Sequence, residues 1–112
     1  MRRVHCLALA AYLLASVVSV HIAPDAVEML LARGHGEKDF WIANVFYACT
    51  GGNSFALVRV GTPENPAEYD LTEIEGINVY VPKSMSFEGD IPDIVTFPRK
   101  NGFRDVGARN AM

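Results

Sequence analysis

The sequence predicts an α+β fold, in which one short N-terminal helix packs on mostly antiparallel strands of a small, β-rich domain. The chain has 112 residues, which is about the size of one domain. Half of its residues are hydrophobic and 10% are aromatic, so it can bury a core and is not a disordered chain. Runs of β-branched and aromatic residues recur between turns that contain Gly or Pro, whereas one segment has helical spacing.

The first two elements follow from alternation and from helix-end signals. Residues 18–22 alternate apolar and polar side chains, which predicts a half-buried strand. Residues 24–33 predict a helix, because Pro24 suits the first helical position and Gly34 suits the exit. Its buried face is expected at positions with i, i+3, i+4 spacing, which are Val27, Leu30 and Leu31.

The middle of the chain predicts a hairpin and two further strands. Residues 40–48 are rich in aromatic and β-branched types, which favours a strand that is covered on both faces. A turn at 49–53 and a strand at 54–60 complete the hairpin. Two short strands are expected after a loop, at 71–75 and 77–81.

The C-terminal part predicts one more strand and then a tail. Residues 91–97 have strand composition, but Pro92 confines the strand to an edge or a bulge, because proline cannot donate to the ladder. Residues 98–112 are polar and basic, and we expect them to be loosely ordered. The domain is therefore expected at 18–97.

The N-terminal residues 1–17 form an apolar extension outside this domain. Arg2 and Arg3 precede an apolar run that ends at Val18, and this is the pattern of a secretory signal peptide. The run is shorter than the about 20 residues that a membrane span needs, so no stable span is expected. Cleavage after Ser19 would cut into the first strand. An apolar N-terminal helix and an upstream start codon are the alternatives.

Composition excludes several classes of function. A formal net charge of −3 argues against binding of nucleic acid through its phosphates. Two cysteines exclude a disulfide-rich scaffold. Enzymatic activity is the least favoured hypothesis, because neither a phosphate-binding loop nor an acid–base–nucleophile set can be assembled from the sequence.

Cys49 is the residue whose side chain offers the most reactive chemistry. It ends an apolar strand and is followed by Thr50, Gly51 and Gly52, a turn that can expose a thiol beside backbone amides. Amide N–H groups directed at sulfur favour the thiolate, which attacks disulfides and binds metals. Cys49 is therefore the candidate thiol and metal-binding residue, and the other three residues are the supporting turn. The alternative is a buried, inert cysteine at a strand end.

The histidines and the acidic run are expected to be solvated. No histidine has metal-ligand spacing to another histidine or to Cys49. The histidines are His5, His21 and His35. The acidic run flanks loops and alternates with apolar residues, which is typical of a solvent-facing surface, and its members are Glu64, Glu68, Asp70, Glu73 and Glu75.

Four segments together resemble the HesB-like family, which includes the A-type iron–sulfur carriers. They are Ala-Cys-Thr-Gly-Gly at 48–52, the string from Val-Arg-Val-Gly-Thr-Pro at 58–69, Glu-Gly-Ile-Asn-Val-Tyr-Val-Pro-Lys-Ser at 75–84, and the opening Val-His-Ile-Ala-Pro-Asp-Ala at 20–26. The resemblance covers residues 18–97. Within the family, the chain is most similar to a branch of small proteins with a Cys-Cys or Cys-selenocysteine pair.

The resemblance implies a compact β-rich HesB-like domain in which Cys49 matters. In A-type carriers this cysteine acts with a Cys-x-Cys pair near the C-terminus to hold iron or an iron–sulfur cluster. Here no cysteine follows Cys49, and Ala48 precedes it, so neither partner arrangement is present. Because a cluster usually needs four protein ligands, the resemblance implies a carrier-like module that lacks its partner cysteines.

Two hypotheses for function follow. The first is a thiol-dependent carrier or binding module for iron or an iron–sulfur cluster, acting as a homodimer or with a protein partner. The second is a non-catalytic structural or protein-binding module of the same fold with an inert Cys49. Because members of the family work inside the cell, we expect the chain in the cytoplasm, or exported if residues 1–19 are a genuine signal peptide.

Overall fold

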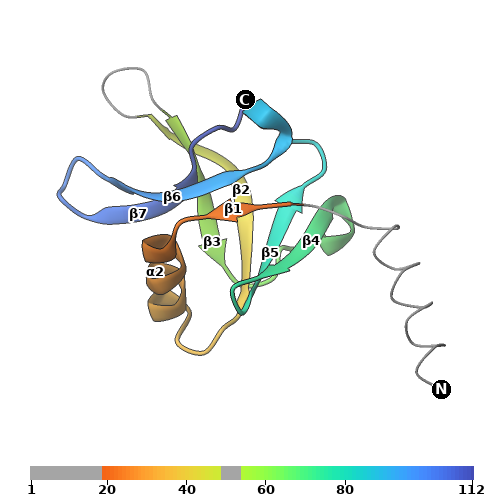
Figure 1. Cartoon of the computed structure of the whole chain (residues 1–112), viewed down its shortest axis with the longest axis horizontal. Coiled ribbons are helices and arrows are strands. Elements are labelled where there is room, and N and C mark those ends of the chain that lie inside the picture. Colours follow the sequence, from red (N-terminus) through yellow and green to blue (C-terminus); the bar gives the residue numbers. More distant parts are fainter. Residues whose placement is uncertain (1–18, 49–53) are drawn as a thin grey trace.

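The computed structural model describes residues 19–48 and 54–112, which form a curled, half-closed sheet with an α-helix beside it (Figure 1). The strands are β1 (His21–Ile22), β2 (Asp39–Ala48), β3 (Ser54–Val60), β4 (Tyr69–Ile74), β5 (Ile77–Pro82), β6 (Asp93–Pro98) and β7 (Arg104–Ala108), and the α-helix is α2 (Pro24–Gly34). Two short 3-10 helices, η1 (Pro66–Glu68) and η2 (Glu88–Asp90), lie in the connections. The sheet order is β1-β6-β7-β3-β2-β5-β4.

The predicted α+β class is wrong, because the described residues are mostly β. Seven strands share one sheet, whereas α2 has only 11 residues. The expectation of mostly antiparallel strands is approximately right, since four of the six pairings are antiparallel. The parallel pairings are β1 with β6 and β2 with β5.

The helix α2 packs on the core through a narrow stripe of small and medium side chains. Ala26 and Leu30 are fully buried, and Val27 is half-buried against the core. Leu31 is 39% exposed, so its predicted place in the buried face is wrong. The helix faces the core through the i, i+4 pair Ala26 and Leu30, and this rotation carries Leu31 to the solvent side.

The β2–β3 hairpin is confirmed and contains an irregularity. Ile42 pairs with Val58, but the next pair is Phe46 with Ala56, so β2 holds two more residues than β3 in this interval. Such an insertion bends a strand and disrupts its ladder. From Asn44 to the end of β2 the side chains are exposed or half-buried, so the predicted coverage of both faces is wrong for this half of the strand.

The strand β6 is internal, which corrects the prediction of an edge strand. It pairs with β1 on one side and with β7 on the other. Pro92 precedes the first paired residue, Asp93, so the ladder does not need its missing N–H. The carbonyl of Pro92 instead accepts a hydrogen bond from the N–H of His21 at 2.9 Å.

The segment expected to be a loosely ordered tail contributes β7, which lies between β6 and β3. Val106 and Ala108 of this strand are fully buried. Beyond the strand, the Asn110 amide donates to the carbonyls of Glu88 and Ile91, both at 2.7 Å, and accepts from the N–H of Asp93 at 2.9 Å. These contacts fasten the C-terminal residues to the turn before β6.

Candidate functional site

The predicted thiol turn lies outside the described residues. Cys49, Thr50, Gly51 and Gly52 fall in the interval 49–53, and their role stays a prediction. The structure defines the residues on either side of this interval, because Ala48 ends β2 and pairs with Ser54 at the start of β3. Cys49 is thus the residue that directly follows β2 in the chain.

The described parts of the chain contain no group of three or more His, Cys, Asp or Glu side chains that could hold a metal ion. His21 faces solvent, as predicted, and its Nδ1 lies 2.7 Å from Asp93 Oδ1. His35 ends α2 in the left-handed conformation and is exposed. Neither histidine is therefore part of a metal site assembled from residues 19–48 and 54–112.

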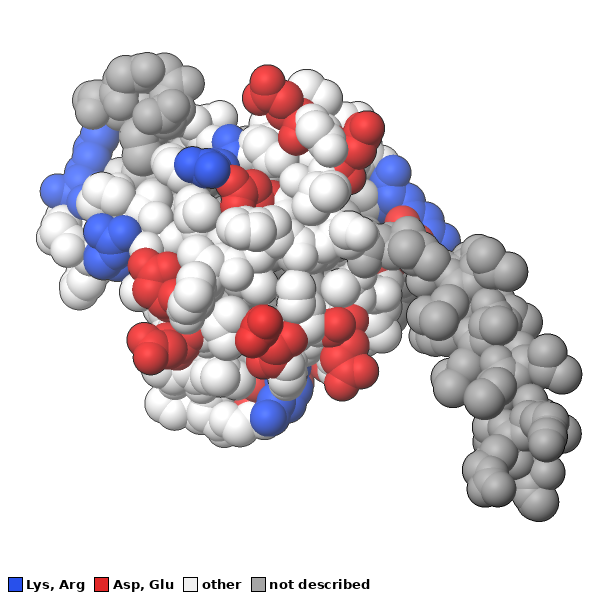
Figure 2. All heavy atoms as spheres, viewed as in Figure 1, with Lys and Arg blue, Asp and Glu red and all other residues white. Residues whose placement is uncertain are grey.

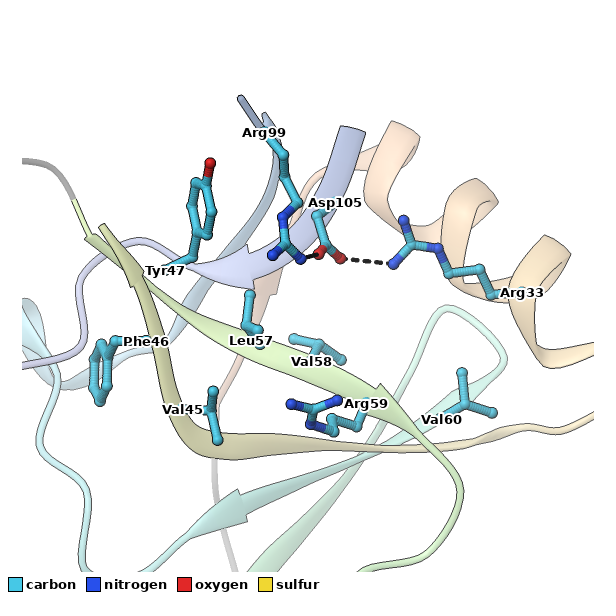
Figure 3. A pocket seen from close by; sticks show the side chains of 10 residues that line it. All are labelled: Arg33, Val45, Phe46, Tyr47, Leu57, Val58, Arg59, Val60, Arg99 and Asp105. Carbon is cyan, nitrogen blue, oxygen red and sulfur yellow. Dashed lines mark hydrogen bonds and ion pairs between the residues drawn. The ribbon is translucent and has the colours of Figure 1, made fainter. Parts of the chain in front are cut away.

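The described residues do form an open cleft where β2 bends away from β3, and we call it the arginine cleft (Figure 3). Its volume is about 690 Å³. It is lined by side chains from α2, β2, β3, β7 and the turn after β6, which are Arg33, Val45, Phe46, Tyr47, Leu57, Val58, Arg59, Val60, Arg99 and Asp105. The group has no local signal in the sequence, because its members are scattered over more than 70 positions.

Asp105 joins two of the three arginines of the cleft. Its Oδ1 accepts a hydrogen bond from Arg33 and its Oδ2 accepts one from Arg99, each at 2.7 Å. Figure 3 shows the two guanidinium groups on opposite sides of this carboxylate. Arg33 also donates to the carbonyl of Arg104 at 2.8 Å. These contacts hold both guanidinium groups in place at the upper rim of the cleft.

Tyr47 holds the Arg99 side chain from a second direction. The centre of the Arg99 guanidinium lies 4.5 Å from the centroid of the Tyr47 ring, which is a cation–π contact. The Tyr47 hydroxyl accepts a hydrogen bond from the N–H of Lys100 at 2.8 Å. The Tyr47 ring also packs against Phe97, with 5.6 Å between ring centroids. Arg99 is therefore fixed by a carboxylate and an aromatic ring.

The charges of the cleft do not cancel. The side chain of Arg59, from β3, is exposed and has no hydrogen bond or ion pair with any of the described residues. Three arginines and one aspartate leave two positive charges at a cleft of a chain whose formal net charge is −3. Figure 2 shows one face of the molecule, on which several acidic side chains lie over the lower half. The cleft is thus a local positive region on an acidic protein.

The surroundings of Asp105 stabilise its charged form. Burial raises its pKa, but hydrogen bonds from Arg33, from the N–H of Val106 and from Arg99 outweigh this, so the pKa lies below the ordinary value of 3.8. A carboxyl whose pKa is lowered by folding contributes stability above its unfolded pKa and loses that contribution as the pH falls. Protonation of Asp105 at acid pH therefore removes part of the stability that its contacts with Arg33 and Arg99 give to the folded state.

We expect the folded state to lose stability progressively below about pH 4, in part through Asp105. Asp105→Asn keeps the size of the side chain but removes the charge. It will lower the free energy of unfolding at pH 7 by about 1–3 kcal/mol, and the further loss between pH 5 and pH 3 will be smaller than in the parent. Denaturant unfolding at a series of pH values measures both effects.

Glu64→Gln provides the matched control, because Glu64 is exposed and has no ion pair with a described residue. It should leave the free energy of unfolding at pH 7 within about 0.5 kcal/mol of the parent. An equal acid-side loss in Asp105→Asn and in the parent would contradict the assignment to Asp105.

The arginine cleft can bind but offers little for covalent chemistry. Guanidinium groups stay protonated and donate paired hydrogen bonds, which suits carboxylate and phosphate groups. The apolar side chains Val45, Phe46 and Val60 are each more than 40% exposed beside them. No helix among residues 19–48 and 54–112 is long and apolar enough to cross a membrane. Fold and cleft together define a small, mostly β protein with a positively charged cleft.

The chain belongs to the CC/Se motif containing family, whose model matches residues 18–97. This match is consistent with the resemblance to small proteins that carry a Cys-Cys or Cys-selenocysteine pair, and it covers the same residues, 18–97. No curated protein and no solved structure matches the chain. The matched range ends before β7, so Asp105 of the arginine cleft lies outside it.

Proposed function

We propose that the chain is a thiol-dependent binding or carrier module of HesB-like type, which handles iron, an iron–sulfur cluster or another thiol-reactive ligand through Cys49. The observation that supports this most is the position of Cys49, which is the one cysteine within the range that matches a family named for its CC/Se motif. In this chain Ala48 precedes it, so the proposed chemistry uses a single thiol in place of a vicinal pair.

The ligand count defines how such a module would hold its cargo. An iron–sulfur cluster usually needs four protein ligands, mostly thiolates. One chain supplies Cys49, and two chains supply two thiolates, so the remaining ligands come from an external thiol or from a protein partner. We therefore propose that the chain acts as a homodimer or with a protein partner, and in the cytoplasm, where a lone thiol remains reduced.

Anaerobic reconstitution tests this proposal. A Cys6→Ser chain, which keeps only Cys49, is incubated with iron, sulfide and a low-molecular-weight thiol, and its visible absorption is recorded after desalting. We expect charge-transfer bands that Cys49→Ala abolishes and that Cys6→Ser leaves intact. The same blank spectrum for the parent and for Cys49→Ala would refute the handling of iron or a cluster.

A second candidate function is a protein-binding module of the same fold in which Cys49 is inert. Exposed apolar side chains favour it, because Val45 and Phe46 of β2 and Val60 of β3 lie uncovered. Alkylation kinetics separate the two candidates. An activated Cys49 will react with iodoacetamide faster at pH 7 than a free cysteine does, whereas an inert Cys49 will react at the same rate or more slowly.

A further inference from the structure

The arginine cleft has the composition of a site for a small ligand with two different parts. One part of its lining is positively charged, from Arg33, Arg59 and Arg99, and the other part is apolar. Its volume of about 690 Å³ falls in the range of roughly 300–1,000 Å³ that is typical of small-molecule sites. Figure 3 shows that Arg59 extends from β3 beside Val45 and Val58, so the charged and apolar parts are contiguous.

The three arginines differ in what they can offer a ligand. Arg33 and Arg99 each give one N–H to Asp105, and each keeps further guanidinium N–H groups for an acceptor. Arg59 gives none to the described residues. Asp105 compensates one of the three charges. An incoming anion therefore meets two uncompensated positive charges, and two of the guanidinium groups are already held in place.

Preorganisation distinguishes these arginines from ordinary surface cations. An unrestrained arginine loses about 2 kcal/mol of rotamer freedom when it binds, which offsets much of its attraction for an anion. Arg99 is already restrained by Asp105 and by the Tyr47 ring, and Arg33 by Asp105 and the carbonyl of Arg104. This part of the entropic cost is met when the protein folds, so it does not weaken binding.

We infer that the arginine cleft binds a small oxyanion, a carboxylate or a phosphate, that is carried on an apolar or aromatic body. The oxyanion accepts hydrogen bonds from Arg59 and from the free N–H groups of Arg33 and Arg99. The apolar body covers Val45 and Leu57, which line the cleft together with Arg59 and which a fully hydrated ion would leave uncovered. The side chains that would hold the oxyanion, Arg33, Arg59 and Arg99, are separate from Cys49, so this site can be tested independently of the thiol.

Titration of the full-length chain with four probes tests the inference. Phenyl phosphate and benzoate carry both parts of the ligand, inorganic phosphate carries only the charge, and benzyl alcohol carries only the ring. We expect saturable binding of the first two by calorimetry, with chemical-shift changes at the Arg Nε–H signals. Inorganic phosphate and benzyl alcohol should bind at least about tenfold more weakly. The tighter of the two aromatic probes identifies the oxyanion as phosphate or carboxylate.

Arg59→Gln is the decisive variant, because Arg59 is exposed and has no partner among the described residues, so its replacement should not disturb folding. We expect about a tenfold loss of affinity for the aromatic oxyanion that binds, which corresponds to one charge-assisted hydrogen bond. Lys83→Gln removes an exposed cation outside the cleft and should bind as the parent does. Raising the salt concentration should weaken binding to the parent.

Several outcomes would overturn the inference. No saturable binding of either aromatic oxyanion would do so, as would equal affinities for the parent and for Arg59→Gln. Equal affinities for inorganic phosphate and phenyl phosphate would contradict the proposed contribution of the apolar lining to binding. Cys49→Ala should bind the probes as the parent does. A negative result in the iron reconstitution would therefore not contradict oxyanion binding in the arginine cleft. Failure of the probes to bind would likewise not contradict the proposed role of Cys49.

Discussion

A chain that ends at residue 97, where the family match ends, will not fold. Removal of residues 98–112 takes out β7, which pairs with β6 on one side and β3 on the other. It uncovers the ladder groups of both neighbours and the buried contacts of Val106 and Ala108. A small domain is stable by only about 5–15 kcal/mol, and the loss of an internal strand exceeds that margin.

Circular dichroism and urea unfolding measure this effect. The full-length chain should unfold in one cooperative transition, and the chain of residues 1–97 should have none. Removal of residues 2–17 is the matched control, because it deletes a similar length that the sequence places outside the domain, and we expect it to keep the transition. A cooperative transition with an unchanged midpoint in the 1–97 chain would show that β7 is dispensable.

A point variant tests the same attachment without deleting a strand. Asn110→Ala removes two donated hydrogen bonds and one accepted hydrogen bond that fasten the C-terminal residues to the turn before β6. We expect a loss of about 1–3 kcal/mol in the free energy of unfolding, because backbone groups of Glu88, Ile91 and Asp93 lose their partner. An unchanged stability of Asn110→Ala would contradict the importance of this attachment.

The misassignment of the C-terminal tail has a simple physical cause. Only Val106 and Ala108 of β7 enter the core, and two small apolar residues are too few to produce a periodic signal. The charges around them suggested solvation, but the structure places three of them, Arg99, Asp105 and Arg109, in ion pairs. Asp105 binds Arg33 and Arg99, and Arg109 binds Asp93. A tail in which charges such as Asp105 and Arg109 pair with distant residues cannot be distinguished from a solvated one by local sequence.

The elements that were predicted well are those whose signals are local. The helix boundaries follow from Pro24 and Gly34, and α2 spans these two residues. The β2–β3 hairpin and the strand pair β4 and β5 lie within a few residues of the predicted ranges. The order of the strands in the sheet has no such local signal. The strand β6 is connected to β3 only through β7, and this pairing depends on residues far apart in the chain.

The candidate sites divide in the same way. Cys49 could be identified from its local motif, and it lies outside the described residues. The arginine cleft could not, because Arg33, Arg59 and Arg99 stand on three different elements and meet only after the sheet has curled. A weak signal was available in the tail, where Asp105 is the one acidic residue after Arg99 and thus a plausible ion-pair partner.

Gly107 will not tolerate a side chain, and the reason lies in the packing across β7. A Cβ at this position would lie 2.8 Å from the carbonyl oxygen of Ala56 and 3.0 Å from both Phe55 Cβ and Phe97 Cε1. Phe55 and Phe97 come from the strands on either side of β7, and their rings stack with centroids 4.1 Å apart and planes within 4°. The missing side chain of Gly107 lets these rings meet.

Gly107→Ala is therefore expected to lower the free energy of unfolding by about 1–3 kcal/mol, as overpacking of a buried site does. The backbone oxygen of Ala56 cannot rotate away, so the strands or the aromatic pair must shift. Because Tyr47 packs on Phe97 and holds Arg99, that shift should also weaken oxyanion binding in the arginine cleft. Urea unfolding and titration with the aromatic oxyanion that binds the parent measure the two effects.

Gly34→Ala is the matched control for this change, because its nearest neighbour is a side-chain atom, Phe40 Cζ, at 3.2 Å. A phenyl ring can move by a few tenths of an ångström, and alanine favours a helix over glycine by up to about 1 kcal/mol, so a cost below about 1 kcal/mol is expected. If Gly107→Ala were no more destabilising than Gly34→Ala, the close approach of β3 and β6 side chains over β7 would not constrain the fold. A large loss confined to Gly107→Ala would tie the stability of the sheet and the geometry of the cleft to the same position.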